Sequence, residues 1–327
     1  MKKDIITLGH GSGAGLTRKL IEDVFNSKFK LPTLDDGAEI EHRTVVSTDA
    51  HVIKPIFFPG GDIGKLSVTG TVNDVSMSGA KPAYLLSAFI IEEGFPIADL
   101  KTIVGSMQKA ASEAGVKIIA GDTKVVEKGK CDGIYITTTG VGYLPENVNL
   151  NSKNISAGDK ILVNGTLGDH TVAIINSREN LQLEPAPESD CAPLNGLVET
   201  MLKNGDVKFL RDATRGGVAT ILNELIEDNG LGIIINEVDL PIKDATNALC
   251  GLLGLDPLYM ANEGKLVAFV KGETDQLISK MQSQKYGKKS AVIGEVTTEV
   301  KGVYLRTSIG GLRPLLMLES DPLPRIC

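Results

Sequence analysis

Hydrophobic and polar positions recur along the chain with two different periods, and each period predicts one kind of element. Apolar and polar residues alternate one by one over residues 43–53, which is typical of a strand. Small and apolar residues recur every three or four positions over residues 65–80 and 99–115, which predicts two helices. The apolar runs at 83–91 and 116–126 predict buried strands. The first half is therefore expected to mix helices and strands.

The same kind of pattern begins again after the polar stretch NLNSKNISAGDK, which ends at residue 160. A strand is predicted at KILVNG, helices from Thr171 and over residues 194–203, and a further helix within DATRGGVATILNELIEDN. Strands are predicted at LGIIIN, KLVAFV and SAVIGEV, and the periodicity fades after about Gly311. The repeated order predicts an α+β protein with two α/β halves of similar size.

Length supports this division, because 327 residues exceed the usual size of one domain. We expect an N-terminal Gly-rich arm over 1–41, domains over 42–155 and 156–310, and a C-terminal tail over 311–327. A helix is predicted in the arm over residues 16–25.

Charge and composition exclude several classes of function. The net charge of −7 disfavours nucleic-acid binding, which needs a concentrated surplus of Lys and Arg. No apolar run approaches the roughly 20 residues of a membrane helix, and no secretory leader is predicted, so we expect a cytoplasmic protein. Four widely spaced cysteines without a CxxC pair predict neither a zinc cluster nor a disulfide framework.

Three acids lie in or beside turn-rich, small-residue segments between residues 48 and 74. Asp49, Asp62 and Asp74 could converge on a hard cation such as Mg²⁺, and glycines nearby would let backbone N–H groups approach phosphate oxygens. The alternative is that the acids cap helices and the glycines make turns. PGGDIGKL is not a Walker A motif, because no Ser or Thr follows Lys65.

Two other polar groups lie next to apolar strands. In GDTKVV, Asp122 and Lys124 are two positions apart and would share one face of a strand, where they could supply a metal ligand and a cation. The alternative is an exposed ion pair. In ANEGK, Glu263 precedes an apolar strand, and burial there would raise its pKa and suit it to accept a proton. The alternative is an exposed turn residue.

Two Gly-containing motifs in the second half lie at predicted helix starts. GTLGDH and RDATRGG place glycine beside Asp, His or Arg, where the helix dipole favours anions. His170 is one of four histidines, and a single histidine is more often structural than catalytic.

Taken in order, these motifs resemble the HypE family of hydrogenase maturation factors, in the superfamily of aminoimidazole ribotide (AIR) synthetase and selenophosphate synthetase. The resemblance spans GHGSG, FFPGGDIGKL, GTVNDVSMSGA, GDTKVV, GTLGDH, DATRGG, ANEGKL and the terminal PLPRIC. The terminal motif is the most specific. The chain departs from the family pattern at Ala14, where a second glycine is expected, and at His51, where an aromatic residue is commoner.

The resemblance implies a PurM-like, AIR synthetase-like fold of two α/β domains with a flexible C-terminal tail. It also implies a homodimer formed through an extended sheet of the first domain, with ATP in a groove near the domain junction and a requirement for Mg²⁺. The implied metal and phosphate ligands are Asp49, Asp74 and Asp122. The residues implied near the nucleotide are Gly60, Gly61, Asp62, Lys65 and Asn73.

The implied reaction produces the cyanide ligand of the iron in [NiFe] hydrogenase. The carbamoyltransferase HypF would load a carbamoyl group onto the sulfur of Cys327. ATP-dependent dehydration would then give a thiocyanate, whose cyanide passes to the HypC–HypD complex. Lys124 and Glu263 are the implied bases, and which of them removes which proton stays open. The 17 residues from Gly311 could span about 55 Å, and prolines near the end would stiffen them.

Two other functions stay open at this point. One is a small-molecule ATP-dependent synthase of the same superfamily, although GHGSGAG lacks the reactive cysteine of selenophosphate synthetases. The other is an ATP-gated scaffold whose tail is a docking peptide.

Overall fold

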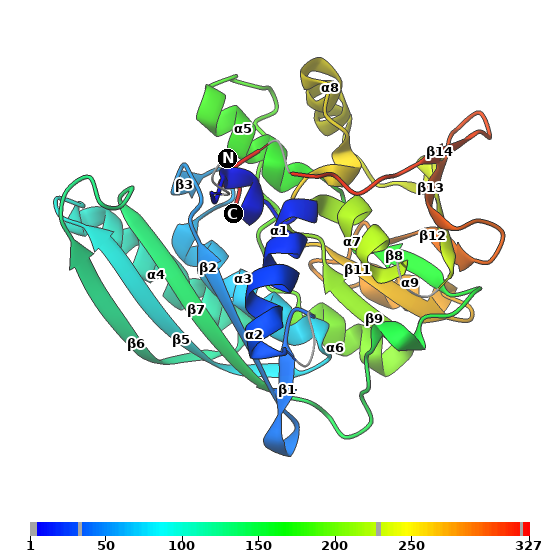
Figure 1. Ribbon diagram of the computed structural model, residues 1–327, viewed down its shortest axis with the longest axis horizontal. Helices are drawn as coiled ribbons and strands as arrows, with labels where there is room; N and C mark the ends of the chain where they lie inside the picture. The colour runs from blue at the N-terminus through cyan, green and yellow to red at the C-terminus, as the bar shows by residue number, and fades with distance from the viewer. Residues whose placement is uncertain (1–4, 32–34, 227–229, 321–322) are drawn as a thin grey trace.

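Two β-sheets, one from each half of the chain, form the framework of the computed structural model (Figure 1). The structure describes residues 5–31, 35–226, 230–320 and 323–327. The sheets lie side by side with helices packed on them, as expected for two α/β halves. In the ranges described, no helix combines the length and the hydropathy needed to cross a membrane.

The first sheet has the strand order β1-β2-β7-β5-β6, antiparallel except for the parallel pair β5 and β6. Its strands are β1 (Ala38–Ile40), β2 (Thr44–His51), β5 (Lys81–Glu92), β6 (Lys117–Val126) and β7 (Ile134–Tyr143). Helix α4 (Ile97–Ala114) makes the crossover between β5 and β6, and α3 (Ile63–Met77) packs beside it. A small hairpin of β3 (Phe57–Phe58) and β4 (Gly61–Asp62) precedes α3.

Strand β6 forms one edge of this sheet, and its burial differs from the prediction. Its apolar sequence predicts a buried strand, but the residues from Lys117 to Val125 are all exposed. Apolar composition alone does not distinguish a strand covered on both faces from an edge strand that the rest of its own chain leaves uncovered. The large apolar side chains left in solvent are Ile118, Ile119 and Val125.

The second sheet has the order β14-β13-β10-β12-β8-β11-β9, with β10 and β13 parallel and the other pairs antiparallel. Its strands are β8 (Lys160–Val163), β9 (Asp206–Asp212), β10 (Gly232–Asn236), β11 (Leu266–Lys271), β12 (Ala291–Thr297), β13 (Gly302–Arg306) and β14 (Leu312–Pro314). The helices of this half are α5 (Asp169–Glu179), α6 (Asn195–Asn204), α7 (Gly217–Ile226), α8 (Asp244–Leu253) and α9 (Asp275–Gln282). Short 3₁₀ turns lie at Leu8–Gly11, Glu41–Arg43, Ser152–Asn154, Glu237–Asp239 and Pro257–Tyr259.

Helix α3 joins the two halves. All of its residues except Lys65 and Asp74 are buried, as expected for a helix with neighbours all round. It contacts β2 and β7 of the first sheet and also β9 and α6 of the second half. Asn73 connects them directly: its Nδ2 donates to the carbonyl of Ala192 (3.1 Å), and its Oδ1 accepts from the N–H of Leu194 (2.8 Å). The two halves therefore share part of one core.

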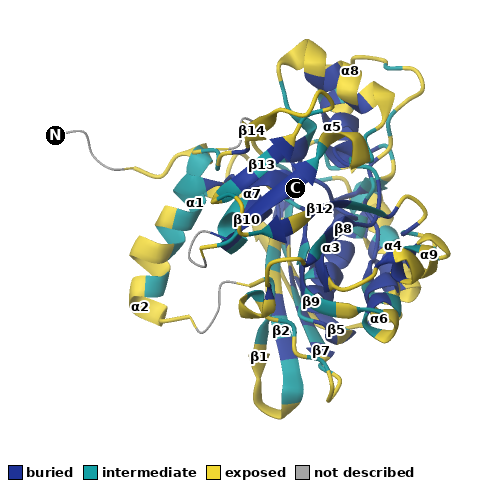
Figure 2. Cartoon of the chain, turned by 90° about the vertical axis from the view of Figure 1, so that its right-hand side faces the viewer, coloured by how far each residue is buried: buried dark blue, intermediate teal, exposed yellow. Residues whose placement is uncertain are grey.

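The N-terminal arm lies across the junction between the two halves (Figure 1). It contains α1 (Gly15–Leu20), a π-helical turn (Ile21–Asn26) and α2 (Ser27–Phe29), which confirms the helix predicted over 16–25. The N–H groups of Gly15 and Leu16 donate to the carbonyls of Leu318 (3.0 Å) and Glu319 (2.9 Å). The outer face of the arm is largely exposed (Figure 2). The C-terminal segment therefore holds the arm in place.

The ends of the sheets differ slightly from the predicted segments. Strand β1 lies within the predicted arm and β14 within the predicted tail, because each is a three-residue strand that pairs with the neighbouring strand in the chain. Short polar strands of this kind carry too little periodicity to be recognised. The last strand of the first sheet ends at Tyr143, and the second sheet begins at Lys160. The division near residue 155 falls between them and stays a prediction.

Candidate active site at the domain junction

A cavity of about 960 Å³ lies where the arm meets both halves of the chain. The arm contributes apolar side chains to one part of it, including Ile21, Phe25 and Phe29. Strand β2, helix α3, the β9–α7 segment, the loop before β11 and the end of the chain contribute polar groups. Those polar residues include Asp49, His51, Asp74, Asp212, Arg215, Glu263 and Cys327. The cavity thus brings together residues that are far apart in the sequence.

Carboxylates crowd this cavity. Removal from water raises the pKa of Asp74 well above its ordinary value, and the negative charges of Asp212 and Asp49 raise it further. Burial likewise raises the pKa of Asp212, with Asp36 as the next contributor. Ser47 Oγ donates to Asp74 Oδ2 at 2.8 Å, which stabilises the charged form only in part. The cavity therefore carries more negative charge than its own side chains offset.

Glu263 is the most deeply buried of these acids, at 4% exposed. Its Oε1 has no hydrogen-bond partner within the described part of the chain. Burial raises its pKa well above the ordinary 4.5, and repulsion from Asp212 and Asp49 adds to the effect. The burial considered for ANEGK is thus confirmed, and the exposed-turn alternative is wrong. A buried carboxylate with an open oxygen and a raised pKa is suited to accept a proton.

The backbone around Glu263 is held by contacts from both halves of the chain. Its N–H donates to Asp190 Oδ1 at 3.0 Å, and Asn73 Nδ2 lies 3.5 Å from its carbonyl oxygen. A Cβ on Gly264 would lie 2.0 Å from the carbonyl oxygen of Asp190, so only glycine fits at this close approach. Asp190 in turn forms an ion pair with Lys265 at 2.7 Å, with side chains 4% and 10% exposed.

The Asp190–Lys265 pair allows a stability test. Asp190→Asn would leave the Lys265 ammonium largely buried without its carboxylate, so we expect a loss of about 3–5 kcal/mol in the free energy of unfolding, measured by urea denaturation. Glu295→Gln is the control, because Lys160–Glu295 is an exposed pair at 2.6 Å and its loss should cost at most about 1 kcal/mol. Equal losses in the two variants would contradict the structural role given to Asp190.

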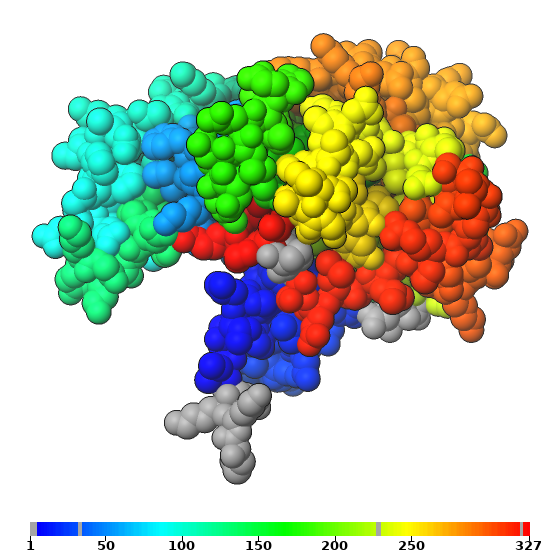
Figure 3. Space-filling view, turned by 90° about the horizontal axis from the view of Figure 1, so that it is seen from above, coloured from blue at the N-terminus to red at the C-terminus, as the bar shows by residue number. Residues whose placement is uncertain are grey.

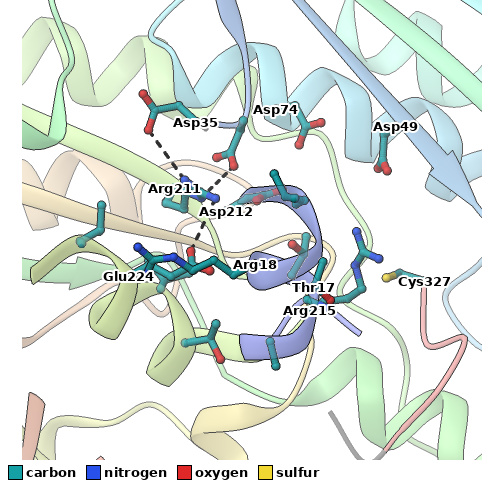
Figure 4. Close-up of a pocket in the computed structure, with 18 of the residues that line it drawn as sticks. Thr17, Arg18, Asp35, Asp49, Asp74, Arg211, Asp212, Arg215, Glu224 and Cys327 are labelled. Atoms are coloured by element: carbon teal, nitrogen blue, oxygen red, sulfur yellow. Dashed lines mark hydrogen bonds and ion pairs between the residues drawn. The ribbon is translucent and has the colours of Figure 1, made fainter. Parts of the chain in front are cut away.

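Arg215 supplies positive charge at the end of the cavity where the chain terminates. Figure 4 shows its guanidinium beside Cys327 and near Asp49. The negative charge at Cys327 is the largest influence raising the pKa of Arg215, followed among the charges by Asp49 and Glu263, while loss of water opposes the rise. Arg215 Nη1 also donates to the carbonyl of Gly11 in the arm, at 2.9 Å. Arg215 therefore joins the arm to the end of the cavity that holds Cys327.

Arg211 forms the charged centre at the other end (Figure 4). Its guanidinium lies 2.8 Å from Asp36, 3.8 Å from Asp35 and 3.7 Å from Glu224. Burial raises the pKa of Asp36 to about 6, although Arg211 opposes the rise. Asp35 and Asp36 are thereby held against β9.

Of the predicted acids, Asp49, Asp74 and Glu263 line this cavity, whereas Asp62 and Asp122 do not. Asp122 and Lys124 lie on β6 and pair with each other at 2.7 Å, with side chains 62% and 69% exposed. The hydrogen bond from Lys124 is the main cause of the lowered pKa of Asp122. Within one chain, the two residues therefore form the exposed ion pair that was the alternative considered from the sequence. Neither residue lines the cavity.

The residues of PGGDIGK make structural contacts with other described residues. Asp62 caps α3, accepting from the N–H groups of Gly64 (2.7 Å) and Lys65 (3.0 Å). Lys65 Nζ donates to the carbonyl of Gly60 at 2.8 Å. Gly60 has φ +91°, and a Cβ there would lie 2.6 Å from the carbonyl oxygen of Ser189. Gly60, Gly61, Asp62 and Lys65 do not line the cavity.

The end of the chain is docked rather than extended into solvent. The N–H of Val52 points to the carbonyl of Cys327 (3.4 Å) and that of Lys54 to the carbonyl of Arg325 (3.3 Å). Ile326 is 2% exposed and packs in the core of the first half. In Figure 3 the last residues, in red, lie between the blue arm and the green helix α5. The tail predicted as flexible therefore ends in a fixed position, with Cys327 at the cavity.

Several cavity residues were not predicted as site residues. Asp212 and Arg215 belong to RDATRGG, where the sequence indicates a helix start but not which side chains face a cavity. His51 is 2% exposed, its Nε2 lies 3.4 Å from Asp49 Oδ2, and burial lowers its pKa. Ala14 also lines the cavity, so both departures from the family pattern lie at this site.

The donor chemistry of the cavity suits Mg²⁺ in part. Asp49, Asp74 and Asp212 supply carboxylate oxygens, which this ion prefers, and a cation would offset the repulsion that raises two of their pKa values. As the side chains stand, no three His, Cys, Asp or Glu residues in the described ranges are grouped closely enough to hold a metal ion. The cavity residues therefore fit Mg²⁺ in their charge and in the type of ligand atom that they offer.

Comparison with known proteins agrees with this architecture. Residues 34–144 match the N-terminal domain model of AIR synthase related proteins, and residues 156–305 match the C-terminal domain model. The carbamoyl dehydratase HypE of Cupriavidus necator is 48% identical over 337 aligned positions, covering 100% of this chain and 96% of the relative.

Two solved structures are also similar along at least nine-tenths of the chain. A HypE–HypF complex matches at 49% identity and a TM-score of 0.88, covering 91% of this chain and 99% of the solved one. A HypE structure in complex with ATP matches at 42% identity and a TM-score of 0.84, covering 99% and 100%. The chain has the two-domain AIR synthetase-like fold, and it belongs to the HypE family of carbamoyl dehydratases.

Proposed function

We propose that this chain dehydrates a carbamoyl group carried on the sulfur of Cys327 to a thiocyanate, at the expense of ATP. The observation that carries the proposal is that Cys327 lines the same cavity as Glu263. Glu263 is a buried carboxylate whose Oε1 accepts no hydrogen bond from the described residues. A carrier sulfur and a proton acceptor are the two groups that this reaction requires from the protein. The relative from C. necator is named carbamoyl dehydratase, and a similar structure holds ATP, which favours this reaction over a small-molecule synthase.

The proposed chemistry proceeds in two steps. The amide oxygen of the S-carbamoyl group attacks the γ-phosphoryl group of ATP, ADP leaves, and one N–H proton is lost. The C–O bond then breaks, phosphate departs, the second N–H proton is lost, and a carbon–nitrogen triple bond forms. The sum is S-carbamoyl cysteine plus ATP giving S-cyano cysteine, ADP and phosphate. ATP is needed because an amide oxygen is a poor leaving group until it is phosphorylated.

Glu263 is proposed as the base for one of these protons. Its burial keeps water from competing for the proton, and its raised pKa brings it closer to neutral pH, where a general base is most effective. Lys124 is retained as the second candidate, although it is exposed on β6 of its own chain.

The nucleotide is proposed to lie in the cavity between the arm and the β9–α7 segment. Asp49, Asp74 and Asp212 would hold Mg²⁺, which when bound neutralises phosphate charge. Gly60, Gly61, Asp62, Lys65, Asn73 and Asp122 stay predictions as nucleotide-site residues. Arg215, placed beside Cys327, would orient the carbamoyl group or the transferred phosphoryl group by charge.

The proposal includes the partners that the chemistry requires. The carbamoyl group would come from a carbamoyltransferase of the HypF type, since a similar HypE structure was solved in complex with HypF. The cyanide would pass through a HypC–HypD complex to the iron of [NiFe] hydrogenase. A reducing, cytoplasmic setting is proposed, and Cys131, Cys191 and Cys250 form no disulfide in the described part of the chain.

A homodimer is also proposed, formed through β6. This edge strand leaves Ile118, Ile119 and Val125 in solvent, and a second copy would cover them and bring Asp122 and Lys124 next to another chain.

The proposed dimer can be tested by measuring the molar mass of the chain in solution. Ile119→Lys is expected to halve the molar mass measured by sedimentation equilibrium, because it places a charge in the proposed contact. Ile97→Lys is the control, since Ile97 is equally apolar and 70% exposed but lies on α4. A wild-type chain that is monomeric at micromolar concentration would contradict the proposal.

The reaction can be tested without a partner enzyme. Cyanate carbamoylates thiols, so the chain is treated with cyanate, freed of excess reagent, and mixed with MgATP. We expect the nitrile stretch of a thiocyanate in the infrared spectrum, absent without ATP and absent in Cys327→Ser. If a Glu263→Ala, Lys124→Ala double variant forms the nitrile at the native rate, neither residue is the base.

A further inference from the structure

The last three peptide carbonyls of the chain are held by two side chains of helix α5. His170, at the start of α5, places Nε2 at 2.7 Å from the carbonyl oxygen of Ile326. Arg178, near the end of α5, donates from Nη1 to the carbonyl of Pro324 (3.1 Å) and from Nη2 to that of Arg325 (2.9 Å). Both contacts reach the backbone next to Cys327 from the second half of the chain.

The tautomer of His170 follows from its neighbours. The N–H of Cys191 donates to Ser189 Oγ at 3.1 Å, and Ser189 Oγ lies 2.8 Å from His170 Nδ1. Since the Ile326 carbonyl can only accept, Nε2 carries the hydrogen and Nδ1 accepts from the Ser189 hydroxyl. His170 is 0% exposed, and burial lowers its pKa, so the neutral ring is favoured. A neutral histidine thus makes one directed bond to the tail.

Arg178 joins the tail to the first half of the chain. Its Nε and Nη2 also donate to the carbonyl of Lys54, at 3.1 and 2.6 Å. The side chain of Arg325 bonds to the same part of the first half, donating to the carbonyl of Val52 at 2.8 Å and pairing with Asp132 at 2.5 Å. The tail therefore lies between helix α5 and the first half of the chain, and the guanidinium of Arg178 bridges the two.

We propose that His170 and Arg178 are positioning residues that clamp the terminal peptide by its backbone carbonyls and thereby hold Cys327 in the cavity. The docked side chain of Ile326 fixes the register, because it is buried in the core of the first half. Neither clamp residue lines the cavity, so neither is a catalytic residue. The docking stands independently of the reaction, and only the effect on dehydration rests on the proposed function.

The clamp has opposite consequences for two properties of Cys327. Holding the sulfur in the cavity shields it from reagents in solution, and it raises the fraction of molecules ready for dehydration. Weakening the clamp should therefore increase thiol labelling and decrease dehydration. A variant that merely misfolds would not show this pair of effects with an unchanged melting temperature.

The first experiment measures alkylation of Cys327 by iodoacetamide, followed by mass spectrometry of the C-terminal peptide. Arg178→Ala is expected to increase the alkylation rate about tenfold, because loss of hydrogen bonds from a charged group shifts a docking equilibrium by at least that factor. Arg306→Ala is the matched control, since Arg306 is an exposed arginine on β13 whose side chain donates to Asn236 rather than to residues 323–327. Equal alkylation rates in Arg178→Ala and the wild type would overturn the clamp.

The second experiment uses a pair of His170 variants. The amide of His170→Gln can reach the position of Nε2 and donate to Ile326, whereas that of His170→Asn reaches the position of Nδ1 and bonds only to Ser189. We expect His170→Gln to label near the wild-type rate and His170→Asn to label several times faster. Equal labelling rates in these two variants would contradict the role of the Nε2 bond.

Single-turnover dehydration of cyanate-carbamoylated chain completes the test. Arg178→Ala is expected to form the nitrile at least about twofold more slowly than the wild type, and His170→Asn to a smaller extent, with unchanged melting temperatures, because the rate follows the fraction of docked molecules. If labelling changes as predicted but the wild type forms no nitrile, the clamp stands and the proposed reaction fails. If the nitrile forms at the wild-type rate in Arg178→Ala despite faster labelling, the positioning role is overturned.

Discussion

Cys327→Ser is expected to reduce thiocyanate formation by at least about a thousandfold, since removal of the reacting side chain of a catalytic group commonly costs this much or more. The sulfur is the atom that carries the carbamoyl group in the proposed reaction, and a serine hydroxyl is a far weaker nucleophile at neutral pH. The substitution changes one atom at a partly exposed position, so the melting temperature should stay close to that of the wild type.

Cys131→Ser is the matched control for this variant. Cys131 is also partly exposed, but it lies outside the cavity, and its Sγ donates to the carbonyl of Ile90 at 3.8 Å. It should form thiocyanate at the native rate. Hydrogenase maturation that persists after deletion of Cys327 would instead support the scaffold alternative, in which the tail is only a docking peptide.

Glu263→Gln is expected to slow dehydration by about 10²–10⁴-fold while it stabilises the fold, because the amide cannot accept the proton but also carries no buried charge. Single-turnover nitrile formation measures the rate, and thermal unfolding measures the stability. We expect the melting temperature at pH 8 to rise by about 2 °C or more. A Glu263→Gln variant with native turnover would contradict the role of this residue as a base.

The stability effect has a defined pH dependence. Burial raises the folded-state pKa of Glu263 above the ordinary 4.5, so the folded chain disfavours the ionised form relative to the unfolded chain. Below the unfolded pKa both states are protonated and the wild type pays no penalty. The penalty grows as pH rises from 4.5 toward the folded pKa and is complete above it. The gain in stability from Glu263→Gln should therefore be absent at pH 4 and largest at pH 8.

Glu113→Gln is the control with the opposite sign. The hydrogen bond from Lys285 is the main cause of the lowered pKa of Glu113, so its ionised form is favoured in the folded chain. The substitution should leave stability unchanged or slightly lower at neutral pH, with little effect on dehydration.

The dehydration rate of the wild type should also depend on pH. As pH falls, the rate should decrease at a higher pH than it would with an ordinary carboxylate as the base, because Glu263 must be ionised to accept a proton.

Periodicity predicts most of the helices and strands, since each depends on neighbouring residues. The strand that contains Asp49 and the strand that follows Glu263 lie as expected, and both acids reach the cavity. The placement of Asp122 and Lys124 could not be predicted in the same way. Their spacing puts them on one face of a strand, but only the sheet order shows that this strand is an edge.

The roles of other predicted residues depend on long-range packing. Asp62 has the residue type and loop context of a nucleotide-site acid, yet within this chain it caps α3, an alternative that the sequence left open. Arg215 lies in a recognisable motif, but its position beside Cys327 depends on contacts between segments more than a hundred residues apart. The resemblance to a family supplied the significance of the terminal cysteine, which composition and periodicity could not.

Mass spectrometry of the C-terminal peptide tests the central claim most directly. The chain is incubated with the carbamoyltransferase, carbamoyl phosphate and MgATP, and the mass of the peptide containing Cys327 is followed in time. The account predicts the gain of a carbamoyl group on Cys327 and then the loss of one water. An unmodified sulfur accompanied by continuing ATP turnover would contradict it.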